Sequence, residues 1–386
     1  INYKKRNKLF LMKIIGLLSC GRSGQDLFLS LLDGHNQILQ FPGYVIFNKE
    51  LSNIFSLKSK RDIAEKFSKL YPHFFDSKIN KIERHHQLGI KKNQYFTVDI
   101  KKFTYNFEKN SSVKSNSSKL KVLIELNKSY YRASNKSLKD IKIFMIQFHV
   151  FYNLSNYLKI FSNKENITII LTLRDILASL GSTCKKWLRY EPNALDAHTL
   201  YLNIIGHLKQ IYRLKKLNKK IYIIQLEKLH TENTRVMKDF CRIFKMKYKK
   251  SLKDSTFFGL KWWGDKTSLK YLNGVNPKFK NKFYSNFFFK KDIYFIEKKI
   301  INLLRFYNYP IRSVSKNYKI LDIIPYKFEF LIWADGVKKI NVKKILKIPL
   351  FWVMRVLNLY TDSNYENFDF PYSIGSTKNK IHKFKK

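Results

Sequence analysis

The stretch Cys20-Gly21-Arg22-Ser23-Gly24-Gln25-Asp26 decides how the chain folds. One apolar run, Lys13–Ser19 (KIIGLLS), precedes it, and another, Leu27–Asp33 (LFLSLLD), follows it and ends at Gly34. This order predicts a buried strand, a tight glycine loop and a helix that stops at Gly34. Such a loop directs backbone N–H groups and the positive end of a helix dipole to one point, which suits an anion.

Arg22 strengthens this expectation, because its planar and permanently charged guanidinium matches phosphate or sulfate oxygens. The loop is not a nucleoside-triphosphate P-loop of the form G-x-x-x-x-G-K-[ST], since its glycine spacing differs and the lysine is missing. A plain strand-to-helix turn, in which the glycines only permit tight geometry, is the other interpretation. The loop by itself therefore predicts an anion site without naming the ligand.

The composition predicts a globular, strongly basic protein. With 386 residues, 45% hydrophobic and 16% aromatic, the chain can bury a sizeable core and is not a disordered polymer. The formal net charge of +47 favours anionic partners such as nucleic acid, a membrane surface or an acidic substrate. Part of the lysine excess also fits the drift of an AT-rich genome, because Lys, Asn, Ile, Phe and Tyr are abundant together.

Cysteine usage and apolar runs bear on location. Cys20, Cys184 and Cys241 are widely spaced and form neither a disulfide framework nor a metal cluster. No run of 18 apolar residues occurs, so we expect no transmembrane segment and a cytoplasmic location. Residues 340–360 form a basic, apolar helix candidate through which peripheral membrane contact is conceivable, and residues 376–386 form a lysine-rich tail.

Alternation of strands and helices predicts the fold class. Besides Lys13–Ser19, the predicted strands are Ile141–Phe148, Ile167–Leu173 and Ile221–Leu226. The predicted helices after residue 140 are Phe151–Ile160, Asp175–Trp187, Leu195–Leu217, Thr231–Phe244 and 290–306, and residues 44–140 read as a mostly helical insertion. We therefore expect an α/β fold with a mostly parallel central sheet that is covered on both faces.

Several polar residues follow directly on predicted strands. Gly21–Gly24, His149 and Arg174 each stand at the carboxyl end of one. Active sites of parallel sheets lie beyond these ends, so the three are expected to share one crevice. Arg174 can bind a phosphate through two N–H groups, and Ser182, eight residues later in a helix, can donate to the same phosphate. A salt bridge that caps the helix is the alternative role for Arg174.

Together the two stretches resemble the sulfotransferases that use 3′-phosphoadenosine 5′-phosphosulfate (PAPS), in particular their bacterial GRSG-type branch. In that family a strand–[KR]-[ST]-G–helix loop holds the 5′-phosphosulfate, and Arg22-Ser23-Gly24 matches it. A strand–R–x₇–S element holds the 3′-phosphate, and Arg174 with Ser182 matches that spacing. The segment Ile221–Leu229 is similar to the family's next strand and its Y-E-D-L sequence.

The resemblance implies a P-loop-like three-layer sandwich and two regions of the chain. Residues 1–310 would be the catalytic domain, with the helical insertion at about 44–140, and residues 311–386 a basic C-terminal extension of unknown role. The insertion would form a lid or an acceptor-binding wall. Trp262 and Trp263 could cover the nucleotide or pack in the core.

The site residues that the resemblance implies for PAPS fall into two groups. They are Gly21, Arg22, Ser23, Gly24, Gln25 and Asp26 in the loop, with Arg174 and Ser182 beyond it. Gln25 and Asp26 depart from the family, which usually places hydroxyl residues after the loop glycine. Leu226 likewise replaces the tyrosine of Y-E-D-L.

The reaction expected is transfer of a sulfuryl group from PAPS to a hydroxyl or amine. Arg22 would stabilise charge on the leaving phosphate, His149 would be the base and Glu227 a weaker rival, with no metal required. The acceptor is not readable, although the lysine excess favours an anionic glycan. The alternatives are a nucleotide-phosphate kinase of related fold and a non-catalytic, basic nucleic-acid-binding protein.

Overall fold

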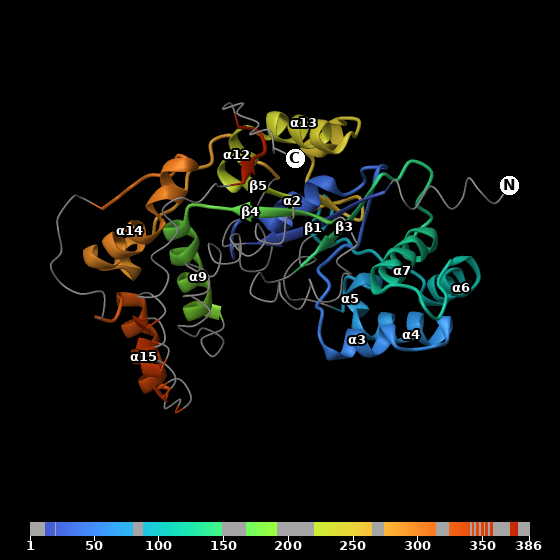
Figure 1. The fold of residues 1–386 in the computed structure, drawn as a ribbon, viewed down its shortest axis with the longest axis horizontal. Coiled ribbons are helices and arrows are strands. Elements are labelled where there is room, and N and C mark those ends of the chain that lie inside the picture. Colours follow the sequence, from blue (N-terminus) through green and yellow to red (C-terminus); the bar gives the residue numbers. More distant parts are fainter. Residues whose placement is uncertain are drawn as a thin grey trace.

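A six-stranded sheet forms the centre of the protein in the order β2-β3-β1-β4-β5-β8, with every neighbouring pair parallel (Figure 1). The computed structural model describes residues 12–19, 21–79, 88–148, 167–190, 220–264, 274–313, 324–339 and 371–376, and nine positions between 342 and 357. The strands are β1 (Lys13–Ser19), β2 (Ile38–Gln40), β3 (Ile143–Gln147), β4 (Ile167–Leu173), β5 (Ile221–Gln225) and β8 (Tyr372–Ser373). The prediction of an α/β fold with a mostly parallel sheet is confirmed.

The helices cluster around this sheet. Before β3 they are α2 (Gln25–Leu32), α3 (Lys49–Phe55), α4 (Lys60–Leu70), α5 (Pro72–Phe75), α6 (Ile100–Asn110) and α7 (Lys119–Ala133). After β4 they are α9 (Ile176–Tyr190), α12 (Leu226–Thr231), α13 (Asn233–Phe244), α14 (Lys290–Phe306) and α15 (Lys327–Lys338). A small antiparallel hairpin joins β6 (Thr256–Phe257) to β7 (Leu260–Lys261).

The strands alternate their side chains between two apolar cores. On one face Ile15 and Leu17 of β1 pack with α2 and α13, which lie together above the sheet with α12 in Figure 1. On the other face Leu18 joins a core that includes α4, α7, α9 and α14. Both faces of the sheet are therefore covered, as the apolar runs predict.

Gly16 lies at the centre of β1 and leaves room for the side chains that pack over it. A Cβ atom there would come within 2.7 Å of the Phe148 ring and 3.0 Å of the Ile169 side chain. A larger residue would therefore force one of these two side chains to move. The register of β1 and β4 pairs Ser19 with Thr172, so the loop that follows β1 and the residues that follow β4 start side by side.

Helices α3–α7 build the predicted helical insertion around an aromatic cluster. Phe41, Phe67, Phe74 and Tyr130 pack ring against ring with centroid distances of 5.1–6.3 Å. These rings belong to the same core as β3 and β4, so the insertion is packed onto the sheet. The loop predicted at Asn110–Lys119 lies between α6 and α7.

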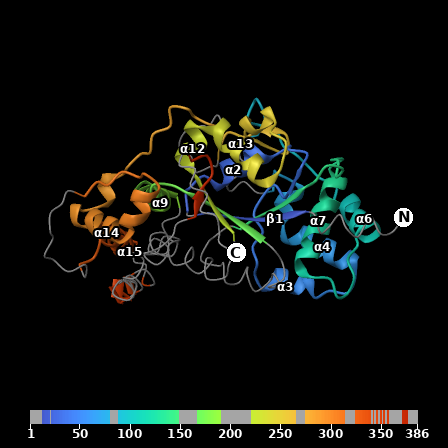
Figure 2. The same cartoon turned by 45° about the horizontal axis from the view of Figure 1, so that its top comes forward.

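The C-terminal part of the chain returns to the sheet. Strand β8 pairs Tyr372 with Tyr222 and Ser373 with Ile223 at the edge of β5. Asp239 of α13 accepts hydrogen bonds from the Tyr372 hydroxyl (3.0 Å) and the Gly375 amide (2.8 Å), which fixes this edge. Helices α14 and α15 lie together at the opposite end of the molecule from α6 and α7 (Figure 2). Within the described part of the chain, no helix is long and apolar enough to cross a membrane.

Several expected elements differ from the prediction. Leu226 begins α12 and is not the last residue of a strand, and neither β2 nor β8 was expected. The helices expected at Phe151–Ile160 and Leu195–Leu217 lie outside the described residues. At residues 342–357 the described positions are helical.

Candidate functional site at the ends of β1 and β4

The loop after β1 has a left-handed backbone at three positions. Gly21, Arg22 and Gly24 have φ values of +54°, +46° and +86°. At Gly24 a Cβ would come within 2.3 Å of Leu226 Cδ1, so this position tolerates only glycine. Arg22 holds its conformation despite carrying a side chain, which costs on the order of 1 kcal/mol and is common at ligand-binding sites.

The end of β4 and the start of α9 hold this loop from the side. Ser23 Oγ lies 2.9 Å from Thr172 Oγ1, the Ser179 hydroxyl donates to the Gly21 carbonyl at 2.6 Å, and Arg174 Nη1 donates to the Arg22 carbonyl at 3.4 Å. Each of the three loop residues is therefore bonded to the segment that begins the second motif. The two stretches singled out in the sequence form one structural unit.

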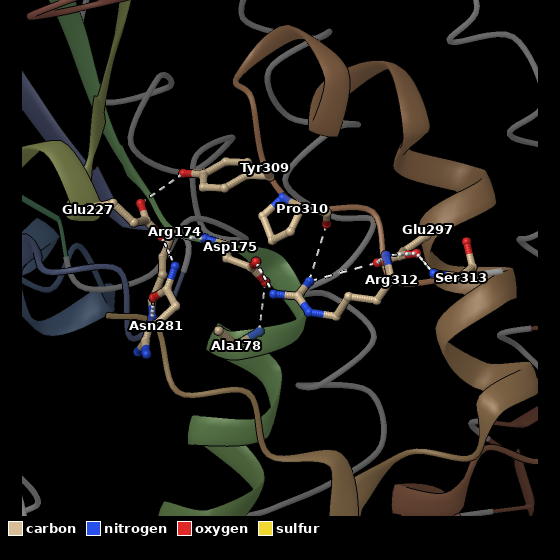
Figure 3. A network of polar contacts seen from close by, with 10 residues as sticks. All are labelled: Arg174, Asp175, Ala178, Glu227, Asn281, Glu297, Tyr309, Pro310, Arg312 and Ser313. Carbon is tan, nitrogen blue, oxygen red and sulfur yellow. Dashed lines mark hydrogen bonds and ion pairs between the residues drawn. The ribbon is translucent and has the colours of Figure 1, made fainter. Parts of the chain in front are cut away.

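Arg174 is half-buried at the tip of β4 and is oriented by a side-chain amide (Figure 3). Its Nε donates to Asn281 Oδ1 at 2.9 Å, and Asn281 Nδ2 in turn donates to Glu227 Oε1. Burial lowers the pKa of Arg174, the Glu227 carboxylate opposes this, and the positive charge of Arg22 lowers it further. Two guanidinium groups thus lie close enough to repel each other, an arrangement that an anion would stabilise.

Glu227 serves as the counter-charge of this region. Besides Asn281, its carboxylate accepts hydrogen bonds from the Asp175 amide (3.0 Å) and the Tyr309 hydroxyl (3.2 Å). Three donors already point at this carboxylate and occupy acceptor sites on both of its oxygens. The arrangement suits a positioning role better than proton abstraction, the role for which Glu227 was the weaker candidate.

Asp175 connects the strand tip to the C-terminal part of the chain (Figure 3). Its Oδ1 caps α9 by accepting from the Ala178 amide at 3.0 Å, and its Oδ2 pairs with Arg312 at 2.5 Å. Glu297, which is fully buried, accepts from the Arg312 amide at 2.9 Å and from the Ser313 amide at 2.6 Å. The neighbour of Arg174 is thus part of a buried charge network between β4 and α14.

Gln25 and Asp26 bind the sheet in this structure. The Gln25 amide nitrogen donates to the carbonyls of Leu17 (2.9 Å) and Phe148 (2.8 Å), which uses both of its N–H groups. Asp26 Oδ1 accepts from Gln147 Nε2 at 2.9 Å. These contacts tie the first turn of α2 to the ends of β1 and β3. At the two positions where the resembling family usually has hydroxyl residues, Gln25 and Asp26 therefore have a structural role.

The remaining predicted residues have different placements. Ser182 is half-buried on α9, one turn after Ser179 and on the same face. His149 and Cys20 lie outside the described residues, so the proposed base has no geometry to report. Trp262 is buried in the core, where its ring meets Phe257 edge to face at 5.3 Å.

Trp263 is half-buried, and its ring already contacts other residues of the protein. Its Nε1 donates to the Gly89 carbonyl at 2.7 Å, and the ammonium groups of Lys92 and Lys261 lie 4.8 and 4.0 Å from the ring centre. The two tryptophans therefore have packing and cation–π roles in this structure.

Sequence reasoning missed the residues that orient the site. Asn281 lies 107 positions after Arg174, Arg312 lies 137 positions after Asp175, and Tyr309 lies 82 positions after Glu227. No local pattern marks these three residues. Thr172 lies in the predicted strand Ile167–Leu173, and Ser179 lies between Arg174 and Ser182, so two hydroxyl residues beside the second motif were the available signal. Among the residues that the structure describes, no group of three or more His, Cys, Asp or Glu could hold a metal.

Comparison with known proteins gives fold-level likenesses. No protein-family model and no curated protein matches the sequence. The sulfotransferase domain of the curacin biosynthetic pathway has 14% identity and a TM-score of 0.38, covering 85% of this chain and 98% of that one. The sulfotransferase domain of the Synechococcus PCC 7002 olefin synthase has 13% identity and a TM-score of 0.34, covering 63% and 76%. Sulfotransferase STF9 from Mycobacterium avium has 11% identity and a TM-score of 0.34, covering 64% and 68%. All three of these neighbours are sulfotransferases or sulfotransferase domains.

Proposed function

We propose that this chain is a sulfotransferase that moves a sulfuryl group from PAPS to a hydroxyl or amine of an acceptor. The observation that carries the proposal is the joining of the two motifs. Gly21, Arg22 and Ser23 are each bonded to the segment that holds Arg174, Thr172 and Ser179. A two-phosphate ligand needs both halves of the site at a fixed distance, and these contacts supply that rigidity.

The side chains present fit the nucleotide. Arg22 and the loop N–H groups would hold the 5′-phosphosulfate, and Arg174 with Ser182 the 3′-phosphate. Two of the Arg174 N–H groups have protein acceptors among the described residues, at Asn281 and Arg22, so the five-donor guanidinium retains donors for a ligand. The repulsion between Arg22 and Arg174 favours a bound anion in the same place.

For sulfuryl transfer the protein mainly has to position the reactants and supply positive charge. Sulfuryl transfer, like phosphoryl transfer, gains most from in-line placement and from cations at the leaving oxygens. Arg22 would stabilise the charge that develops on the leaving phosphate. His149, two residues after β3, remains the proposed base, since an imidazole near neutral pKa can accept the acceptor's proton.

The cellular setting is also a proposal. Cys184 and Cys241 are buried free thiols, and burial raises the pKa of Cys241 to about 11. Thiols kept in this state fit a reducing compartment such as the cytoplasm. The lysine excess still favours an anionic acceptor, for which a glycan is the proposed class.

Binding of the product nucleotide tests the proposal without knowledge of the acceptor. Saturating 3′,5′-adenosine bisphosphate should raise the melting temperature more than AMP does, because only the bisphosphate carries a 3′-phosphate. A ligand that binds only the native state stabilises it by about 2.7 kcal/mol at 100 times its Kd. In Arg174→Ala the bisphosphate and AMP shifts should become equal. Equal shifts in the parent protein would contradict a 3′-phosphate site at Arg174 and Ser182.

Transfer of labelled sulfate from PAPS to a panel of glycans and small acceptors tests the activity. Arg22→Ala and His149→Ala should each lower the rate at least 100-fold. Full activity of Arg22→Ala would contradict the loop assignment. Turnover of Mg-ATP would revive the kinase alternative, and binding to mixed-sequence DNA at high salt would favour the nucleic-acid alternative.

A further inference from the structure

Exposed apolar side chains gather in the C-terminal part of the chain. Of the 18 large apolar side chains that the described residues expose, eight lie between residues 330 and 357. They are Phe330, Trp333, Val337, Val342, Leu346, Leu350, Val353 and Leu357. Folded monomers rarely expose apolar groups in such density, so this surface needs an explanation.

In α15 the apolar residues divide between two faces. Phe328 and Ile332 are buried, and the Phe328 ring meets Phe288 edge to face at 6.1 Å. Phe330, Trp333 and Val337 are more than 40% exposed and follow one another at helical spacing. The buried face anchors α15 to the body of the protein, and the exposed face has no role in that packing.

The other five of these eight exposed residues form what we call the apolar stripe: Val342, Leu346, Leu350, Val353 and Leu357. Each is helical, and their exposures run from 42% to 68%. At 100° per residue these positions fall within an arc of about 80°, which is one side of a helix. The five side chains of the stripe therefore share one side of the helix and are exposed to solvent.

The charges around the stripe have one sign. Residues 340–361 contain Lys343, Lys344, Lys347 and Arg355 and no Asp or Glu. In the sequence these four cations stand among the positions of the stripe and are the only charged residues there. A helical segment that combines an exposed apolar face with cations as its only charges is typical of helices that lie in the surface of an anionic membrane.

We propose that residues 342–357, which carry the apolar stripe and these four cations in their sequence, bind the headgroup region of an anionic lipid bilayer. A second copy of this chain fits less well, because it would bring two all-cationic segments together and repel itself. Anionic headgroups instead complement the lysine and arginine charges, while the side chains of the apolar stripe insert at the boundary with the acyl region. This surface is separate from the loop at Gly21–Gly24, and the proposal does not depend on sulfuryl transfer.

Vesicle flotation with the full chain tests this proposal. Binding should be at least tenfold stronger to phosphatidylcholine vesicles that contain 30% phosphatidylglycerol than to pure phosphatidylcholine, with the gain lost at high salt. The double variant Leu346→Glu, Leu350→Glu should lose at least tenfold in binding to the anionic vesicles. Because both side chains are exposed, its melting temperature should match that of the parent protein.

A matched control separates the stripe from net charge. Ile90→Glu with Tyr105→Glu introduces the same two charges at positions that are 82% and 60% exposed and lie outside the stripe, and it should bind vesicles as the parent protein does. Equal binding to neutral and anionic vesicles, or parent-like binding by the Leu346→Glu, Leu350→Glu variant, would overturn the proposal. A dimer in solution that this variant converts to a monomer would assign the stripe to a second copy instead.

Discussion

Asn281 links the cation at the tip of β4 to its counter-charge. It accepts from Arg174 Nε and donates to Glu227, so it fixes the plane of the guanidinium. Arg174 is half-buried, and in such partly desolvated surroundings a well-aligned hydrogen bond from a charged group is strong. The orientation of Arg174 therefore depends on a neutral residue that is 107 positions away in the sequence.

Asn281→Ala should weaken recognition of the 3′-phosphate selectively. Losing one hydrogen bond to a charged group costs about 1.5 kcal/mol, so the preference for the bisphosphate over AMP should fall about tenfold, while the affinity for AMP stays nearly constant. Isothermal titration with both nucleotides measures this ratio. Asn276→Ala removes an exposed amide from the same segment and should leave the ratio unchanged; an unchanged ratio in Asn281→Ala would contradict the positioning role.

His230 makes the stability of the protein depend on pH. Burial, with help from the charge of Arg174, lowers the pKa of His230 to about 4, against about 6.5 in an unfolded chain. Between these values the unfolded state binds more protons, so stability falls as the pH drops. The loss from this residue between pH 7 and pH 5 is on the order of 2 kcal/mol.

His230→Asn isolates this contribution. The asparagine Oδ1 can accept the Asn276 N–H that His230 Nδ1 accepts at 3.1 Å, but it does not titrate. Urea unfolding at pH 7 and pH 5 should show a pH effect that is smaller by roughly 2 kcal/mol in the variant. Identical pH effects in the two proteins would mean that His230 is not neutral in the native state.

At the scale of the elements, the carboxylate of Asp239 makes two of the contacts that hold strand β8. Asp239 receives the Tyr372 hydroxyl and the Gly375 amide, and the strand itself is two residues long. So short a strand cannot hold its place by ladder bonds alone. Asp239→Ala should therefore release residues 371–376 at a cost of about 1–3 kcal/mol.

Limited proteolysis with mass spectrometry detects this release as new cleavage within residues 371–376. Arg242→Ala is the control, because Arg242 is an exposed i, i+3 partner of the same carboxylate and such pairs contribute less than about 1 kcal/mol. If both variants were cleaved alike, the tyrosine and glycine contacts would not be what fixes the strand.

The sequence predicts the long elements well and the short ones poorly. Strands β1 and β4 match their predicted bounds because each is a seven-residue, mostly apolar run. Helix α14 also matches its predicted bounds, 290–306. Strand β2 has three residues and β8 two, so their existence depends on pairing with β3 and β5 and not on a local pattern. Leu226 begins α12, and its side chain packs against Gly24, a contact that no local sequence pattern predicts.

The candidate site divides in the same way at the scale of the whole molecule. Arg22, Arg174 and Ser182 are readable because each follows a strand at a fixed spacing. Tyr309 and Arg312 come from the far end of the chain, and only the folded arrangement brings them to β4. Residues on both sides of position 310, the predicted boundary of the catalytic domain, therefore contribute to the surroundings of the site.

Arg312 is the residue through which we expect the C-terminal part to stabilise the whole protein. Its guanidinium meets the fully buried carboxylates of Asp175 at 2.5 Å and Glu297 at 3.8 Å. Arg312→Met would leave two buried charges without their cation, and breaking a buried pair in this way costs about 3–5 kcal/mol. Guanidinium unfolding should show this loss, whereas Arg305→Met, at an exposed position of α14, should change stability by less than about 0.5 kcal/mol.

Adding Asp175→Asn to Arg312→Met should restore part of the stability, because the substitution removes one unpaired charge while the amide oxygen can still cap α9. A double variant no more stable than Arg312→Met would show that the loss comes from packing around Phe283, over whose ring Arg312 lies at 4.9 Å, and not from the charges.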